Sequence, residues 1–241
     1  MIIDTYCELV HEAFSKNGMD GLLTDEKVKK LYELSNLLVE TNKTTNLTAI
    51  TDEKDILLKH FVDSSAVCAF IESGASVIDI VCGAGFPSLP LAILRDDLQI
   101  TALDSTGKKV EFVKNASSIL QLHNINAVCA RAEDYVVKYR NAFDVSVSRA
   151  VARLNILSEL SLPMVKVGGK FIAMKSNRGD EEFEEAKKGI SLLGGNLEAK
   201  TEKELSFDSQ TITRSIYVIK KDRQTPDKYP RKYAQIIKNP L

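Results

Sequence analysis

Residues 77–87 read VIDIVCGAGFP, an apolar run that passes into a turn of small residues. A buried parallel strand has this pattern where its carboxyl end meets a ligand. Gly83 and Gly85 lack a Cβ, so the backbone at these positions can turn tightly and approach a bound molecule closely. Asp104 follows after about twenty residues, the spacing at which a second strand presents a carboxylate to ribose hydroxyls. This combination predicts a site for an adenosine-containing cofactor, in preference to an ordinary strand-to-helix turn.

The glycine pattern indicates which of the adenosine-containing cofactors to expect. A dinucleotide site has three glycines at the opening of a helix, so that the pyrophosphate lies on the helix N-terminus. Here Val81 takes the first glycine position, and Phe86 and Pro87 open the helix. S-adenosylmethionine has no phosphates and needs only a close loop, carboxylates and an adenine slot. We therefore expect S-adenosylmethionine as the cofactor, and a nicotinamide dehydrogenase is a distant alternative.

The composition is that of a globular protein. A chain of 241 residues can form one large α/β domain or a core domain with an extension. The four cysteines have no paired spacing, so they suggest neither a disulfide framework nor a zinc site. No segment approaches the roughly eighteen uninterrupted apolar residues that a membrane-spanning helix needs. We expect a soluble cytoplasmic protein with no membrane partner and no metal.

The net charge of −1 is unevenly distributed. From Arg214 onward, eight basic residues stand against two acidic ones, which leaves −7 on the remainder of the chain. Such asymmetry indicates an anionic partner for the C-terminal end. On charge alone, a lysine-rich tail that serves solubility explains it equally well.

The first 70 residues have a helical pattern and form a predicted N-terminal helical cap. One helix is expected to start at Thr24 and to end in the polar run 41–46, whose side chains compete for backbone hydrogen bonds. A further helix is expected to begin at Thr51 or Asp52. From residue 71 to 241, short β-rich runs alternate with helical stretches, which predicts parallel strands joined by right-handed crossovers.

The expected strands lie near 76–81, 99–103, 125–130, 143–148, 168–174, 197–206 and 212–220. The expected helices between them lie near 87–95, 107–121, 153–162 and 180–193. No helix separates the last two strands, so they should pair as a hairpin. The predicted fold is a Rossmann-like class I S-adenosylmethionine-dependent methyltransferase, mainly a parallel sheet with a C-terminal antiparallel hairpin and a basic C-terminal tail.

Short motifs in a fixed order extend over nearly the whole chain. They are residues 46–50 (NLTAI), 59–64 (KHFVDS), 83–87 (GAGFP), 104–105 with 108–109 (DS, KK), 131–134 (RAED), 149–152 (RAVA), 166–169 (KVGG), Lys175 and 225–231 (TPDKYPR). In these motifs the chain resembles the ribosomal RNA small subunit methyltransferase G family, also called glucose-inhibited division protein B. The resemblance implies methyl transfer from S-adenosylmethionine to guanine N(7) in a loop of 16S rRNA near the decoding centre.

The chain departs from the family pattern at three places. The family usually has a glycine where this chain has Val81, an aromatic residue where it has Thr41, and a glycine near Tyr233 and Ala234. A branched Cβ at position 81 would crowd the methionine moiety or force a backbone shift. This departure motivates one alternative, a cofactor-impaired protein that binds RNA or the ribosome. A small-molecule methyltransferase is another, against which the basic C-terminal end and the lack of an obvious apolar lid argue.

The residues expected to bind the cofactor are Asp79, Val81, Gly83, Gly85, Phe86, Asp104, Ala132, Glu133 and Arg149. Asp79 is a candidate for the methionine ammonium, directly or through water, or else a cap for the following turn. Asp104 should bind the ribose, and Ala132 and Glu133 should flank the adenine. Phe86 is expected beside the cofactor or in the core.

Arg149 ends the fourth expected strand, at the edge where ligands bind in such sheets. By resemblance it is the catalytic residue and contacts the cofactor or the target base; an ion pair with Glu133 or Asp134 is the alternative. Guanine N(7) carries a lone pair and no proton, so the reaction needs no general base.

His60 and Asp63 lie three residues apart and could close the pocket from the cap, or form a simple helix-surface contact. The expected RNA-binding residues are these two with Lys175, Arg178, Lys228, Arg231 and Lys232. Tyr229 and Tyr233 are possible stacking platforms between the basic residues. The expected partner is 16S rRNA or the small ribosomal subunit.

Overall fold

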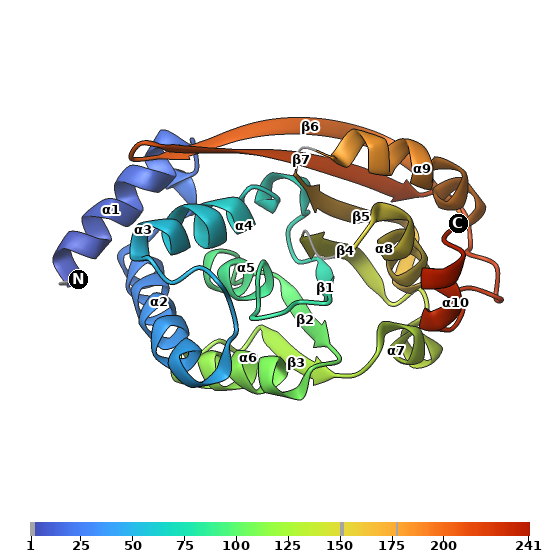
Figure 1. The fold of residues 1–241 in the computed structure, drawn as a ribbon. Coiled ribbons are helices and arrows are strands. Elements are labelled where there is room, and N and C mark those ends of the chain that lie inside the picture. The colour runs from blue at the N-terminus through green and yellow to red at the C-terminus, as the bar shows by residue number, and fades with distance from the viewer. Residues whose placement is uncertain (1–2, 150–151, 177) are drawn as a thin grey trace.

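The computed structural model describes residues 3–149, 152–176 and 178–241. Within them one seven-stranded sheet has the strand order β3-β2-β1-β4-β5-β7-β6 (Figure 1). The strands are β1 (Ser76–Ile80), β2 (Gln99–Asp104), β3 (Ile125–Cys129), β4 (Phe143–Arg149), β5 (Val165–Lys175), β6 (Gly195–Phe207) and β7 (Gln210–Lys221). The first five pair in parallel, and β7 pairs antiparallel with both β5 and β6. The predicted fold class and the predicted hairpin are confirmed.

Alternation along the strands creates two cores, one on each face of the sheet. Val77 belongs to one core and its neighbours Ile78 and Ile80 to the other, because successive side chains of a strand point to opposite faces. One face is covered by α1 (Ile3–Lys16), α2 (Asp25–Thr45), α5 (Ser88–Leu94) and α6 (Gly107–Ile119). The other is covered by α7 (Ala132–Tyr139), α8 (Leu154–Ser161), α9 (Gly179–Leu192) and α10 (Tyr233–Lys238).

The predicted helix boundaries in the N-terminal part follow local capping. The Thr24 hydroxyl accepts a hydrogen bond from the Lys27 amide at 3.3 Å, and α2 ends where Asn46 adopts φ +32°. Asp52 caps the next helical segment by accepting from two amides. That segment runs through α3 (Glu53–Ile56), a π-helical turn (Leu57–Val62) and α4 (Asp63–Ser65). The π-helical turn, which contains His60, was not foreseen from the sequence.

The hairpin strands β6 and β7, with 13 and 12 residues, are the longest of the described sheet and reach across to the N-terminal helices (Figure 1). At its tip, Asp208 pairs with Lys54 at 2.9 Å and Gln210 donates to Asp55 at 2.8 Å. Leu205 and Phe207 enter the core that the N-terminal helices share with the sheet. The N-terminal helices are therefore packed on the sheet, and the predicted domain boundary at residue 70 stays a prediction.

Some of the basic residues near the C-terminal end are paired inside the fold. The Lys221 ammonium is buried and donates to Asn141 Oδ1, Leu162 O and Val165 O at 2.6 to 2.8 Å. Arg214 pairs with a buried aspartate and Arg231 with a buried glutamate. Since these three side chains have partners inside the molecule, the surface that could attract an anion is smaller than the sequence count suggests.

No helix in the described ranges is long and apolar enough to cross a membrane. Within the same ranges, no group of three or more His, Cys, Asp or Glu side chains could hold a metal ion.

Candidate active site

The glycine loop after β1 is fixed by Asp104, the last residue of β2. One carboxylate oxygen of Asp104 accepts from the Gly83 amide at 2.9 Å, and the other accepts from the Thr106 amide at 2.8 Å. The Cys82 amide adds a bond to Leu103 O at 2.9 Å. Each carboxylate oxygen keeps a free lone pair, because such an oxygen can accept more than one bond. Asp104 thus shapes the loop and remains able to accept from ribose hydroxyls.

The two positions in the loop require glycine for different physical reasons. Gly83 has φ +60° and open space within 4 Å of where a Cβ would lie, so a ligand can come close to the backbone. Gly85 has φ +83°, and a Cβ there would lie 2.6 Å from Leu89 Cδ1. Gly85 therefore allows α5 to pack tightly against the loop, while Gly83 leaves room at the surface.

Val81 occupies a conformation that suits glycine. Its φ is +61°, in the left-handed region, where a β-branched side chain clashes with its own backbone. The surrounding strand ends and the bonds of Asp104 hold the loop in this shape despite the strain. Whether Val81 crowds the methionine moiety of a cofactor, as expected from the sequence, stays a prediction.

A cavity of about 120 Å³ adjoins this loop at the carboxyl ends of β1 and β2. Its lining residues are Val81, Leu103, Asp104, Ser105, Ala130, Arg131, Ala132, Glu133, Leu160 and Tyr233. The structure therefore brings together the predicted loop, ribose and adenine residues Val81, Asp104, Ala132 and Glu133. The last two lie in the first turn of α7, a helix that the sequence pattern did not reveal.

Asp79 lies in β1 beneath the loop and is fully buried. One carboxylate oxygen accepts a short hydrogen bond from the Ser88 hydroxyl, and the other has no hydrogen-bond partner within the described part of the chain. Burial raises the pKa of Asp79 to about 7. An unpaired buried carboxylate oxygen costs free energy unless a donor meets it, so Asp79 fits the ammonium of a methionine moiety.

Arg149 ends β4 and is held by residues of the N-terminal helices. Its guanidinium donates to Lys59 O at 2.6 Å, to Asp63 Oδ2 at 3.1 Å and to His60 Nδ1 at 3.0 Å. The expected alternative, an ion pair with Glu133 or Asp134, is wrong; the carboxylate partner is Asp63. Asp63 comes from a helix that the topology folds back over the sheet edge, which sequence spacing does not show.

A second guanidinium contacts the same carboxylate. Arg214 donates from Nε and from a terminal nitrogen to Asp63 at 2.7 and 2.8 Å. Two guanidinium groups therefore share one buried carboxylate. The sequence analysis did not assign Arg214 to the site, although its position in β7 two residues from Ile212 and Ile216 places it on the inward face.

His60 is buried in the same cluster and is neutral. Burial, and then the charge of Arg149, lower the pKa of His60 to about 3. Arginine can only donate, so Nδ1 of His60 accepts from Arg149, and the proton on Nε2 points to the Thr48 hydroxyl at 3.2 Å. The His60 ring stacks on Phe86 with centroids 4.2 Å apart, and Arg149 lies 5.5 Å from the Phe86 ring. Phe86 therefore packs against His60 and Arg149 and does not line the cavity described above.

Comparisons with known proteins show the family of this chain. A family model described as rRNA small subunit methyltransferase G matches residues 27–211. The relative of that name from Staphylococcus aureus (strain Newman) is 46% identical over 222 residues, which cover 91% of this chain and 92% of the relative. The chain belongs to the rRNA small subunit methyltransferase G family. The relative from Acetivibrio thermocellus is also 46% identical, over 93% of each chain.

Solved structures show the fold of this chain. The M. jannaschii TYW2 structure in complex with AdoMet has a TM-score of 0.54 and 14% identity, and covers 67% of this chain and 76% of that chain. The P. horikoshii TYW2 structure in complex with MeSAdo has a TM-score of 0.53 and 16% identity, with 66% and 61% covered. The fold is that of class I S-adenosylmethionine-dependent methyltransferases.

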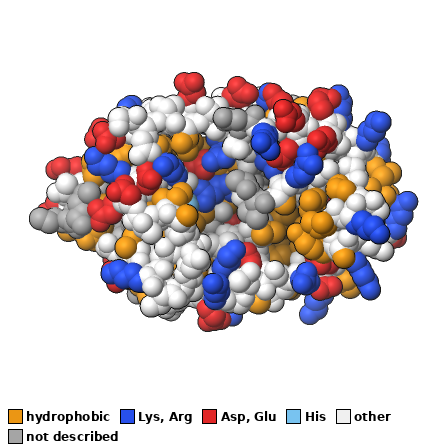
Figure 2. Space-filling model, viewed as in Figure 1, with side chains coloured by type: hydrophobic (Ala, Val, Ile, Leu, Met, Phe, Trp, Pro, Cys, Tyr) orange, Lys and Arg blue, Asp and Glu red, His pale blue; other side chains and the backbone are white. Residues whose placement is uncertain are grey.

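The residues expected to bind RNA fall into two groups. Lys175 is 4% exposed and pairs with Glu182 at 2.7 Å, while Arg231 pairs with Glu159 at 2.6 Å. Neither cation is free for a phosphate, so these two predictions are corrected. By contrast, Arg178, Lys228 and Lys232 are exposed. Figure 2 shows Lys and Arg side chains at the end of the molecule that carries α9 and α10.

The two tyrosines expected as stacking platforms differ in exposure. Tyr229 is 6% exposed and packs in the core of the α7 to α10 face, so it is no stacking platform. Tyr233, in contrast, is 38% exposed. In the motif at 149–152, Ala150 and Val151 lie outside the described residues.

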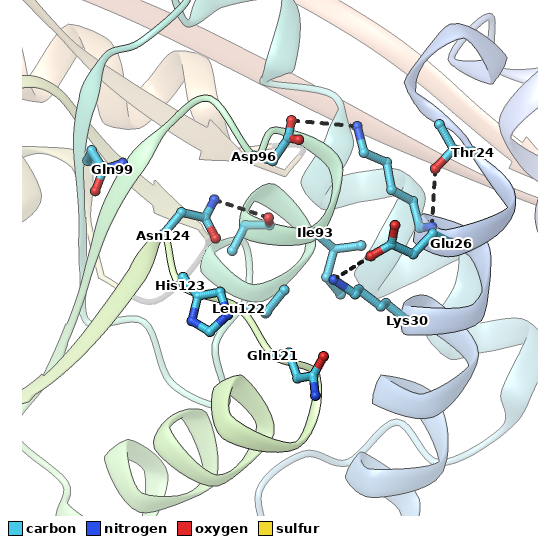
Figure 3. A pocket seen from close by; sticks show the side chains of 12 residues that line it. Thr24, Glu26, Lys30, Ile93, Asp96, Gln99, Gln121, Leu122, His123 and Asn124 are labelled. Carbon is cyan, nitrogen blue, oxygen red and sulfur yellow. Dashed lines mark hydrogen bonds and ion pairs between the residues drawn. The ribbon is translucent and has the colours of Figure 1, made fainter.

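A larger cavity of about 530 Å³ lies elsewhere, between the start of α2 and the loops that lead into β2 and β3 (Figure 3). Its charged side chains pair with one another, since Lys30 contacts Glu26 at 3.0 Å and Lys27 approaches Asp96 at 4.0 Å. It opens at the amino ends of the strands, whereas ligands in such sheets bind at the carboxyl ends. Although this cavity is larger, its location excludes it as the cofactor site.

Replacement of Val81 by glycine should stabilise the protein. The change removes the strain of a branched side chain at positive φ, and we expect a gain of about 1 kcal/mol in the free energy of unfolding. Urea denaturation measures it. The matched control is Val137→Gly on the exposed side of α7, which should lose about 0.5 kcal/mol. A loss of stability in Val81→Gly would show that the left-handed conformation is unstrained.

Replacement of His60 should alter the pH dependence of stability. The folded pKa of about 3 lies below the ordinary 6.5, so the stability contributed by neutral His60 is present above pH 6.5 and is lost as the pH falls towards 3. The slope from one such group is at most about 1.4 kcal/mol per pH unit. In His60→Gln this contribution to the slope should vanish in denaturation curves taken between pH 4.5 and 7. An unchanged slope would mean that His60 is protonated in the fold.

Proposed function

We propose that this protein transfers the methyl group of S-adenosylmethionine to guanine N(7) in 16S rRNA of the small ribosomal subunit. The observation that carries the proposal is the loop fixed by Asp104, with Glu133 and the unpaired oxygen of Asp79 at the same edge of the sheet. Family membership supports an rRNA methyltransferase. A ribosomal acceptor corresponds to a cytoplasmic protein.

Residues that line the cavity, together with Asp79 beneath the loop and Gly83 in it, match the parts of the cofactor. Bound S-adenosylmethionine would supply an electrophilic methyl group on its sulfonium. Asp104 would accept from the ribose hydroxyls, Ala132 and Glu133 would contact the adenine, and Asp79 would meet the ammonium directly or through water. Gly83 leaves the space in which the methionine moiety can approach the backbone.

The protonation states agree with a reaction that needs no general base. Guanine N(7) attacks with its own lone pair and loses no proton. The one histidine near the site, His60, already uses both ring nitrogens, on Arg149 and on Thr48. Catalysis then comes from holding N(7) in line with the methyl group, a proximity effect that can be worth ~7 to 11 kcal/mol.

Arg149 is the residue that we assign to positioning the target base. Asp63, His60 and Lys59 O fix its guanidinium, and its remaining N–H groups can donate to the O6 acceptor of guanine. Arg178, Lys228 and Lys232 would make phosphate contacts, which weaken as salt rises.

Loss of the Arg149 guanidinium should greatly reduce methyl transfer and leave the fold intact, because Asp63 keeps Arg214 as its partner. We expect Arg149→Ala to lower the rate of labelled-methyl transfer to small-subunit rRNA by about 100-fold or more. Arg153→Ala is the matched control, since Arg153 is exposed and pairs with Glu185. Full activity in Arg149→Ala would remove this residue from the site.

The affinity for S-adenosylmethionine should rise with pH in the range 6 to 7.5. Asp79 has a raised pKa of about 7, so its carboxylate, which the cofactor ammonium needs, becomes populated across this range. Below the pKa the affinity should change by up to about tenfold per pH unit. Asp79→Asn should bind more weakly and without this rise in calorimetric titrations. Equal pH profiles for the two proteins would place the ammonium elsewhere.

The strain at Val81 and the small cavity favour a second candidate function. In that case the protein binds rRNA or the small subunit and has lost cofactor binding. Calorimetric titration with S-adenosylmethionine, with NAD as the control, separates the candidates. Binding of the former alone supports the methyltransferase, and binding of neither, together with retained rRNA binding, supports the second candidate.

A further inference from the structure

Tyr233 has a position that the proposed reaction does not explain. It is the first residue of α10 and lines the cavity beside Val81, Asp104 and Glu133. Its side chain is 38% exposed, and its hydroxyl has no hydrogen-bond partner in the described part of the chain. The ring can therefore leave the cavity without breaking a hydrogen bond.

The backbone that carries Tyr233 is anchored near the same cavity. Arg231 donates to the buried Glu159 through its amide, its Nε and a terminal nitrogen, at 2.9, 2.9 and 2.6 Å. Glu159 lies on α8, and the next residue of that helix, Leu160, also lines the cavity. The start of α10 is thus fixed beside the cavity wall, while the Tyr233 ring has no such anchor.

The cavity is smaller than a usual ligand pocket, and Tyr233 forms part of its wall. Its volume is about 120 Å³, whereas pockets for small-molecule ligands measure ~300 to 1,000 Å³. Val81 cannot easily make room, because a β-branched side chain is stiff at χ1. Asp104 is held by two backbone amides. The Tyr233 ring is the aromatic part of this wall, and no hydrogen bond in the described part of the chain holds it there.

We propose that Tyr233 sets the affinity of this protein for the adenosine end of S-adenosylmethionine, by filling part of the adenosine pocket until its ring turns outward. The inference rests on the proposed cofactor. If only a fraction of molecules has the ring outward, the apparent dissociation constant is the intrinsic one divided by that fraction. The side chain at position 233 then determines how tightly the adenosine is bound.

Calorimetric titration with two probes tests this proposal. S-adenosylmethionine and 5′-methylthioadenosine share the adenosine, but the second lacks the amino-acid moiety. Tyr233→Ala should tighten the binding of both by about tenfold, whereas Tyr233→Trp should weaken both. Tyr233→Phe should match the wild type, since the hydroxyl has no partner. Ile237→Ala is the control for α10, because Ile237 is exposed and does not line the cavity.

The outcomes separate this inference from the proposed function. Unchanged or weaker binding of both probes to Tyr233→Ala overturns the inference, while binding to the wild type keeps the proposed cofactor. If Tyr233→Ala loses the helical signal of α10, the weaker binding expected for Tyr233→Trp decides the matter. Binding to Tyr233→Ala but not to the wild type supports the inference. Absence of binding to every variant overturns both proposals.

Discussion

The carboxylate of Asp104 joins the ends of two parallel strands, and the geometry of the site depends on this contact. Its bonds to the amides of Gly83 and Thr106 hold the β1 loop against the end of β2. These bonds keep Val81 in a left-handed conformation that its side chain disfavours. The same carboxylate faces the cavity, so the group that shapes the loop is also available to bind the ribose.

The second part of the site is assembled from segments far apart in the chain. Arg149 comes from β4, Asp63 and His60 from the N-terminal helices, and Arg214 from the C-terminal hairpin. Asp63 pairs with both guanidinium groups and so joins the three segments. The N-terminal helices and the long hairpin therefore contribute to the site, because their side chains fix the direction of the Arg149 guanidinium.

The strands and the loop could be predicted because their signals are local. Apolar runs, the spacing of Gly83 and Asp104, and the polar break before β7 each depend on a few neighbouring residues. The partners of Arg149 could not be predicted, since a π-helical turn and the packing of a distant helix decide them. Lys175 and Arg231 looked like phosphate ligands because sequence shows a charge without showing the buried glutamate that neutralises it. The helix α7 was missed because its acidic start was interpreted only as a cofactor segment.

The most direct test of the central claim is identification of the methylated product. Purified protein, S-adenosylmethionine with a labelled methyl group and small ribosomal subunits would be incubated, and the modified nucleotide in 16S rRNA would be identified by mass spectrometry of digests. The proposed function predicts label in N(7)-methylguanosine at one position of 16S rRNA. Cofactor binding without any labelled rRNA, or label on a different atom, would contradict it.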